Sequence, residues 1–196
     1  MGVMTAGSAW LPAAPWSVAD LERLPDDGNR YELLDGGLLV SPAPSPRHQR
    51  AAFRLAMALD AVAPAGIEVL PAPLAVRPQG HLRASEQSTE LQPDVVVARA
   101  ADYTARDLPV APLLAVEVLS PSSRLVDLHL KRAAYERIGV ACYWVVDPLE
   151  PSLRAFERSS GGELVEVAHV IGESLFTAQL PFPVAVRPSE LVAERT

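Results

Sequence analysis

The stretch that decides the fold runs from Pro112 to Ser120 and reads PLLAVEVLS. Such an apolar run is typical of a buried strand. Glu117 lies within it, where a carboxylate is costly unless it is paired, protonated or bound to a metal. A second apolar run begins with Pro93 and Asp94 and continues as VVVA. Two strands that each carry an acid indicate a site for a hard divalent cation, which makes metal-dependent phosphodiester cleavage the first function to consider.

The surrounding sequence predicts strands and helices that alternate in the middle of the chain. We expect helices over 18–24, 46–63 and 125–138, and strands over 30–34, 38–40, 68–76, 94–98, 112–119, 143–146, 153–158 and 164–170. This order favours an α/β fold with a mixed β-sheet flanked by helices, and with antiparallel hairpins at both ends. Residues 1–15 are expected to form a loose N-terminal tail, and residues 16–196 a single domain.

The composition narrows the class of protein. The chain has 196 residues, of which 49% are hydrophobic, and a formal net charge of −7 with a pI of about 5.1. The acidic balance argues against a broad basic groove for nucleic acid, although a local phosphate site is compatible with it. Cys142 is the one cysteine, which excludes an intrachain disulfide and a cysteine-based zinc site. No secretory signal or membrane span is apparent, so a cytoplasmic protein is expected.

Four residues form the candidate site: Glu32, Asp94, Glu117 and Lys131. Magnesium prefers oxygen ligands, usually one or two carboxylates with water and substrate phosphate. Asp94 and Glu117 are the expected metal ligands, with Glu32 as a third, either direct or through water. Lys131 would stabilise negative charge or orient the attacking water. It shares one helical face with Asp127 and Tyr135, because the three residues are four positions apart.

Each of these residues also has a simpler interpretation. A neighbouring arginine or backbone amides could satisfy Glu117, and Asp94 could merely precede its strand. Glu32 could be an exposed strand position, and Lys131 could form a solvated ion pair with Asp127.

Two further groups of basic residues are left outside the candidate set. His48 follows the start of the 46–63 helix, where an exposed or capping histidine is at least as plausible as a residue of the site. Arg47, Arg50 and Arg54 lie at helical spacing, and a solvated helix face is favoured for them over a phosphate-binding stripe.

The order of short motifs carries a family resemblance. These motifs are YELLDG at 31–36, SPAP at 41–44, RHQ at 47–49, QPDVVV at 92–97, EVLSPS at 117–122, GV at 139–140 and YWVVDP at 143–148, with Asp127, Lys131 and Tyr135 between the last groups. Together they closely resemble the Uma-type putative restriction endonuclease family, within the PD-(D/E)XK nuclease superfamily. The match spans residues from about 16 to 166.

The resemblance implies a restriction-endonuclease-like fold and a nuclease site that uses Mg²⁺ or Mn²⁺. Asp94 matches the Pro-Asp acid of the superfamily, Glu117 its second acid, and Glu32 an additional upstream glutamate. The chain departs from the pattern at Leu119, where the superfamily has a lysine. Lineages of this kind supply the lysine from the next helix, which points to Lys131.

The expected function is therefore metal-dependent endonuclease activity on nucleic acid, with DNA as the implied substrate. A catalytically inactive binding or scaffold protein with the nuclease fold is the main alternative, and Leu119 and the net charge of −7 favour it. A metal-dependent hydrolase that acts on another phosphate substrate is a third interpretation. Apolar strands near the C-terminus and the symmetry of duplex DNA predict a homodimer.

Overall fold

The fold is built around a six-stranded mixed sheet. In the computed structural model, the residues described are 4–5, 15–78, 88–121, 124 and 126–194. The strand order is β11-β10-β9-β8-β6-β4, and β8 and β9 are parallel while the other neighbours are antiparallel. The strands are β4 (Ile67–Pro71), β6 (Val95–Arg99), β8 (Leu114–Val118), β9 (Cys142–Asp147), β10 (Ser152–Arg158) and β11 (Leu164–Ile171). The predicted α/β fold with a mixed sheet is confirmed.

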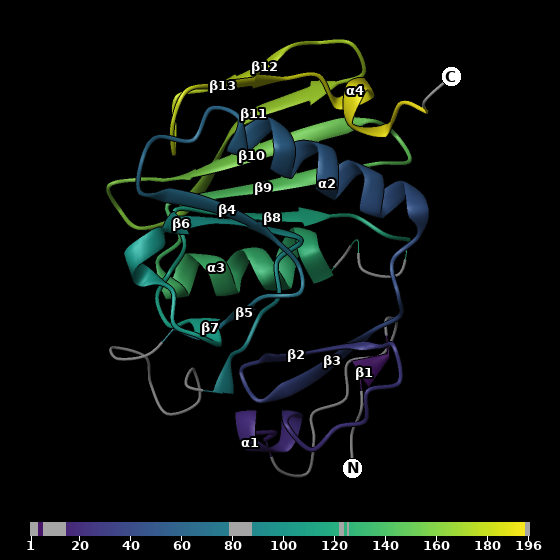
Figure 1. The fold of residues 1–196 in the computed structure, drawn as a ribbon, viewed down its shortest axis with the longest axis vertical. Coiled ribbons are helices and arrows are strands. Elements are labelled where there is room, and N and C mark those ends of the chain that lie inside the picture. Colours follow the sequence, from purple (N-terminus) through teal and green to yellow (C-terminus); the bar gives the residue numbers. More distant parts are fainter. Residues whose placement is uncertain (1–3, 6–14, 79–87, 122–123, 125, 195–196) are drawn as a thin grey trace.

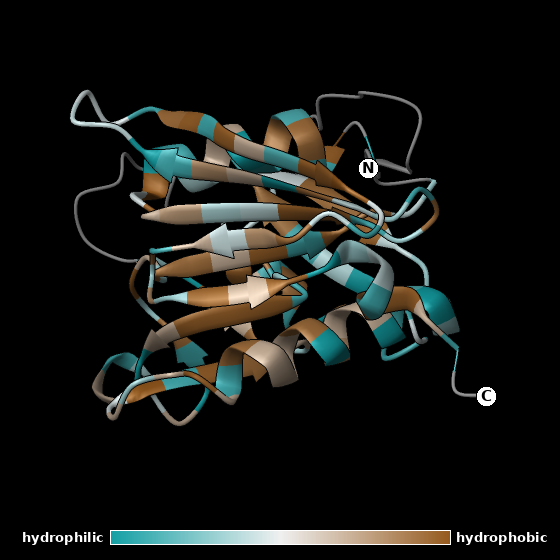
Figure 2. Cartoon of the chain, turned by 90° about the horizontal axis from the view of Figure 1, so that it is seen from above, coloured by the Kyte–Doolittle hydropathy of each residue, from teal (hydrophilic) through white to brown (hydrophobic). Residues whose placement is uncertain are grey.

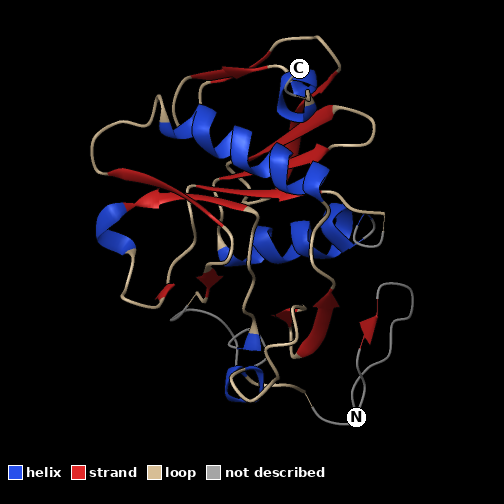
Figure 3. Cartoon of the chain, turned by 45° about the vertical axis from the view of Figure 1, so that its right-hand side comes forward, coloured by secondary structure: helices blue, strands red, loops and turns tan. Residues whose placement is uncertain are grey.

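Helices cover both faces of this sheet (Figures 1 and 3). Helix α2 (Pro46–Asp60) buries Ala52, Leu55 and Leu59 against the face that carries Val116 and Trp144. Helix α3 (Arg132–Ile138) buries Ala134 and Tyr135 against the opposite face, which carries Ala115, Tyr143 and Val145. The apolar spacing predicted for α2 thus reflects its core-facing stripe. Alternation along β8 gives each helix its own set of side chains.

The first hairpin lies outside the main sheet. Strands β2 (Arg30–Leu34) and β3 (Gly37–Ser41) pair antiparallel, and Met4–Thr5 adds the short parallel strand β1 beside β3. Asp35 and Gly36 both have positive φ, as a tight two-residue turn requires. In Figure 1 this small sheet lies on the side of α3 away from the main sheet. The remainder of the predicted N-terminal tail lies mostly outside the described residues.

Two predicted elements each divide into two in the structure, and the helices predicted over 18–24 and 46–63 end earlier, at Leu21 and Asp60. The expected strand 68–76 divides into β4 and β5 (Ala75–Val76), and β5 pairs instead with β7 (Asp107–Leu108). Pro71 and Pro73 account for the division, because neither can donate to a strand ladder. The expected helix 125–138 begins with a π-helical turn, η3 (Val126–Lys131), before α3. Its predicted first residue, Leu125, lies outside the described residues.

The C-terminal region adds elements that the sequence did not reveal. Strands β12 (Phe176–Ala178) and β13 (Val184–Val186) form a hairpin, followed by helix α4 (Pro188–Val192). Phe176 packs edge-on against Trp144, with ring centroids 4.9 Å apart. The apolar side chains of this hairpin therefore complete the core on the α2 side. The hydropathy colouring of Figure 2 shows brown residues along the strands and along α2.

The remaining short elements lie at the edges of the fold. They are helix α1 (Val18–Leu21), which is capped by Ser17, and the 3₁₀ turn η2 (Ala100–Asp102). Neither element contributes a residue to the candidate site.

Candidate functional site

Strand pairing brings Asp94 and Glu117 together. Val95 of β6 is opposite Val116 of β8, so the antiparallel register places Asp94 beside Glu117. The backbone N–H of Val118 donates to Asp94 Oδ2 at 2.7 Å. Asp94 and Glu117 are 4% and 0% exposed, respectively. Two acids that lie 23 positions apart in the sequence are therefore neighbours at the end of the buried sheet.

Glu117 is held from the α3 side of the sheet. Its Oε1 accepts hydrogen bonds from Lys131 Nζ at 3.0 Å and from the Tyr135 hydroxyl at 2.7 Å. Its Oε2 is also buried but has no hydrogen-bond partner in the described part of the chain. Because an unpartnered buried carboxylate oxygen is costly, Oε2 is where an added cation or water would be most favourable.

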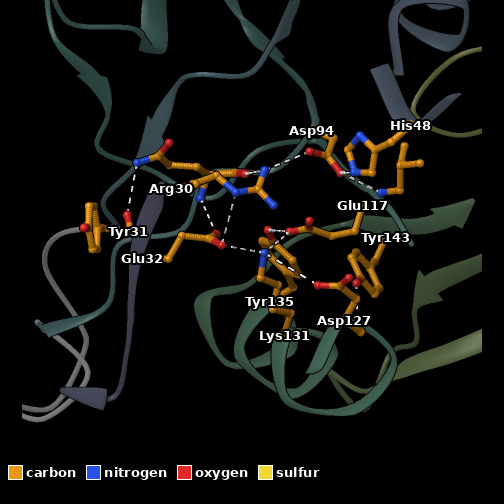
Figure 4. Close-up of polar contacts among 12 residues, drawn as sticks. Arg30, Tyr31, Glu32, His48, Asp94, Glu117, Asp127, Lys131, Tyr135 and Tyr143 are labelled. Carbon is orange, nitrogen blue, oxygen red and sulfur yellow. Dashed lines mark hydrogen bonds and ion pairs between the residues drawn. The ribbon is translucent and has the colours of Figure 1, made fainter. Parts of the chain in front are cut away.

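Lys131 is the centre of a buried ionic cluster. Its ammonium lies 2.9 Å from Glu32 Oε2, 3.0 Å from Glu117 Oε1 and 3.7 Å from Asp127 Oδ1. Figure 4 shows these three carboxylates directed at the lysine from β2, β8 and the η3 turn. Lys131 is 2% exposed, so the alternative of a solvated helix face is wrong.

Glu32 reaches the cluster from the first hairpin. Its Oε1 accepts from the backbone N–H of Gln92 at 2.8 Å, and its Oε2 faces Lys131. The side chain is 1% exposed, which excludes the alternative of an exposed strand position. The structure thus brings together all four predicted residues, with Glu32 linked to Glu117 through the lysine.

Three donors fix the carboxylate of Asp94. Arg30 Nη1 donates to Oδ1 at 2.8 Å, while His48 Nε2 lies 3.2 Å from Oδ2, the oxygen that also accepts from Val118. His48 is 6% exposed, and its Nδ1 is buried with no partner among the residues described. Arg30 also places its Nε 3.6 Å from Glu32 Oε2, so it bridges the two acids (Figure 4).

Burial and charge move the pKa values of the two sheet acids in opposite directions. Burial raises the pKa of Glu117 to about 8, although the charge of Lys131 opposes the rise. Burial would also raise the pKa of Asp94, but the hydrogen bond from His48 and the charge of Arg30 lower it to about 2. Burial disfavours the charged form of Lys131, but Glu117 and Glu32 raise its pKa above the ordinary value. Near pH 7, therefore, Asp94 is ionised, Lys131 is a cation, and Glu117 retains a large share of its proton.

A cleft of about 470 Å³ leads from the surface to Asp94. Arg30 and His48 line it beside Asp94, as do the amino-terminal turn of α2 and the segment that follows β8. Glu117 and Lys131 are buried and do not belong to the described residues that line the cleft. A substrate in the cleft would meet Asp94 first.

The carboxylates of Asp94 and Glu117 are suitable ligands for a hard cation. Among the described residues, no group of three or more His, Cys, Asp or Glu side chains is arranged to hold a metal ion. Asp94 and Glu117 are nevertheless adjacent, all their donor atoms are oxygens, and Glu117 Oε2 is unpartnered within the described chain. Magnesium commonly uses one or two carboxylates and completes its shell with water and phosphate. The residues therefore fit such an ion.

Comparison with known families places this site in context. The model of the Uma2 family, described as putative restriction endonuclease, matches residues 18–189. The chain belongs to the Uma2 family. The matched range contains the whole Glu32, Asp94, Glu117 and Lys131 cluster. The predicted family is confirmed, and membership at this level indicates a nuclease of the restriction-endonuclease-like kind.

A solved structure shares the fold of this Uma2 chain. It is the crystal structure of a putative nuclease belonging to DUF820 from Anabaena variabilis, with a TM-score of 0.66 and 14% sequence identity. The match covers 91% of this chain and 98% of that protein. No curated protein matches the chain. Within the described residues, we find no helix with the length and apolar character needed to span a bilayer.

Arg30, His48 and Tyr135 contact the acids but were not among the predicted site residues. Arg30 and Glu32 are two positions apart on one strand and so share a face, and this spacing could have predicted that Arg30 lies at the site. His48 lies four positions before Ala52 and seven before Leu55, on the buried stripe of α2. Tyr135 was recognised as sharing a face with Lys131, but no role followed from that.

Proposed function

We propose that this protein is a metal-dependent endonuclease that hydrolyses phosphodiester bonds of nucleic acid, with DNA as the substrate. The observation that carries the proposal is the buried Glu117, which lies beside Asp94, holds a lysine on one oxygen and has no described partner on the other. A purely structural carboxylate would be expected to have both oxygens satisfied.

We assign the metal, Mg²⁺ or Mn²⁺, to Asp94 and Glu117, with Glu32 as the third predicted ligand, acting through water. When bound, such an ion supplies an activated water and offsets the charge of the scissile phosphate. Arg30, His48 and the Val118 amide hold Asp94 in one orientation. Lys131 and Tyr135 hold Glu117 by Oε1, which leaves Oε2 for the ion.

In this proposal Lys131 takes the role of the lysine that the superfamily has at the position of Leu119. Its ammonium is directly hydrogen-bonded to the second acid, and its pKa lies above the ordinary value, so it remains charged at neutral pH. A cation at this position would stabilise the negative charge that develops in the transition state. Its contact with Glu32 fixes the position of the ammonium within the buried cluster.

The direct test is cleavage of supercoiled plasmid and single-stranded DNA with Mg²⁺ or Mn²⁺. Asp94→Asn and Glu117→Gln keep the size of each side chain and remove its charge, and each should lower cleavage by at least about 100-fold. Asp60→Asn, an exposed acid at the end of α2, is the matched control and should retain full activity. Equal cleavage by the wild type and both site variants would refute the proposal, provided that thermal melting shows all the proteins folded.

A binding or scaffold protein without turnover is the second candidate. Arg30 and Lys131 already lie against the carboxylates that a metal would need, and this observation favours it. Isothermal titration calorimetry separates the two functions. A scaffold should bind neither Mg²⁺ nor Mn²⁺ and should cleave nothing. The nuclease should bind a metal, and Asp94→Asn should abolish that binding.

We also propose that two copies of the chain associate through apolar strands near the C-terminus. Location in the cytoplasm stays a prediction from the sequence alone.

A further inference from the structure

The walls of the cleft at Asp94 are unlike those of a groove built for a phosphate backbone. Most of their exposed surface is apolar, and the side chains that contribute to it include Pro42, Pro44, Pro73, Pro121, Pro148 and Leu149. These residues come from the segments after β3, β4, β8 and β9, which meet at one end of the sheet. A rim of prolines is rigid and offers flat apolar faces, which gain from contact with another flat, weakly hydrated surface.

The charges of the cleft are few and local. Arg30 and Arg47 are its strong cations, and Asp94 is its acid, while the chain as a whole has a net charge of −7. Duplex DNA carries one charge per about 1.7 Å of its axis, and binding it requires many such cations in a row. Two arginines suit one or two phosphates. The volume of about 470 Å³ is likewise in the range of pockets that take a small molecule.

We propose that this cleft binds one unpaired nucleotide of a single-stranded nucleic acid, with its base against the proline and leucine wall and its phosphate toward Arg30 and Arg47. The inference rests on the proposed nuclease function and specifies the substrate class of the same site. In a duplex the bases are stacked inside, so the apolar wall would meet only charged backbone. An unpaired base has two exposed faces, and binding one of them to an apolar surface stabilises the complex.

Fluorescence anisotropy tests this with three labelled DNA probes: a single strand, a blunt duplex of the same sequence, and that duplex with a single-stranded overhang. Ca²⁺ replaces Mg²⁺, and a gel checks that the probes remain intact. Two variants alter the cleft, Arg47→Ala on its cationic side and Leu149→Asn on its wall. Each has a matched control away from the cleft, Arg50→Ala on the same helix and Leu130→Asn at an exposed leucine of η3.

The single strand and the overhang should bind at least about fivefold more tightly than the blunt duplex. Each cleft variant should weaken single-strand binding by about five- to tenfold, as expected for one lost base or phosphate contact, while the controls stay within about twofold. Equal or tighter binding of the blunt duplex, or cleft variants that behave like their controls, would overturn the inference while leaving the nuclease proposal intact. Failure to bind any probe would count against both.

Discussion

Lys131 is the residue on which the buried cluster depends. It is surrounded by Glu32, Glu117 and Asp127, and all four side chains are nearly inaccessible to water. Removing one partner of a buried ionic group leaves uncompensated charge, which is much more costly than losing a pair on the surface. We therefore expect Lys131→Met to lower the free energy of unfolding by about 3 kcal/mol near pH 7, measured by urea denaturation.

The control for this prediction is an exposed ion pair. Arg23 lies 3.3 Å from Asp20 but its side chain is 77% exposed, so Arg23→Met should change the stability by less than about 0.5 kcal/mol. If both substitutions had the same small effect, the cluster would not contribute to stability in the way its burial indicates.

We expect Glu117 to make binding of the proposed metal dependent on pH. Its pKa is raised to about 8, mainly by burial, and only the ionised carboxylate is a good ligand. Below about pH 8 the metal must displace a proton, so affinity should rise roughly tenfold per pH unit between about 6 and 8 and then level off. Calorimetry in buffers with different ionisation enthalpies should show about one proton released per metal at pH 7.

Asp94 should contribute no such dependence in this range, because its pKa is about 2 and it is already ionised. A flat pH profile together with no proton release would show that Glu117 is not a ligand, or that its carboxylate is ionised before the metal arrives. In Glu117→Gln any remaining metal binding should lose the pH dependence.

At the scale of elements, Gly139 ends helix α3 and directs the chain into β9. Its φ of 92° lies in the left-handed region, which favours glycine, and an added Cβ would meet nothing closer than Ala111 Cβ at 4.0 Å. The cost of Gly139→Ala is therefore backbone strain alone, about 1 kcal/mol of unfolding free energy. Gly161 has no positive φ, and an added Cβ would lie 3.6 Å from Ser159 Oγ, an ordinary van der Waals distance, so Gly161→Ala is the matched control and should be near neutral. Thermal melting of both variants checks the difference.

The elements also show what could be predicted from the sequence. The end of the helix predicted over 125–138, the first hairpin over 30–40, and the acids that precede β6 and lie within β8 all follow from local rules, and the structure has them at these places. The π-helical turn η3 could not be predicted, because the spacing of its residues in the sequence resembles that of one continuous α-helix. Asp127 and Lys131 nevertheless face the site, since residues four apart remain on one side of such a turn.

The residues that were missed depend on contacts between distant segments. His48 and Arg30 meet at Asp94, which comes more than 40 positions after either of them, and no local pattern reports such a meeting. The C-terminal hairpin was missed for a related reason. Phe176 and Val186 belong to strands of three residues, too short for a clear alternation, and their burial is supplied by Trp144 and α2.

At the scale of the whole molecule, the outer edge of the main sheet favours association of two copies. Strand β11 is the last strand of the sheet, and Val165, Val167 and Ile171 project from it with about half of each side chain exposed. The bulge in the β10–β11 pairing falls at Val167, because Ala155 pairs with Ala168 and Phe156 with Glu166. Val165 and Ile171 therefore lie on opposite faces of the sheet, and the three residues mark β11 as an exposed edge strand. By contrast, the apolar residues of β12 and β13 are buried in the core of the same chain. Of the strands near the C-terminus, β11 is therefore the one that we expect to form the interface of the predicted homodimer.

We expect a second copy to pair antiparallel along β11, because this closes two exposed edges with a single two-fold axis. Val167→Lys places a charge on that edge strand and should convert the dimer to a monomer. Light scattering at about 10–100 µM protein would detect the change, because a stable homodimer persists at these concentrations. Val62→Lys, at an equally exposed valine after α2, is the control and should leave the dimer intact. A wild-type monomer across this range would contradict the homodimer, whereas a dimer unaffected by Val167→Lys would place the interface on another face of the molecule.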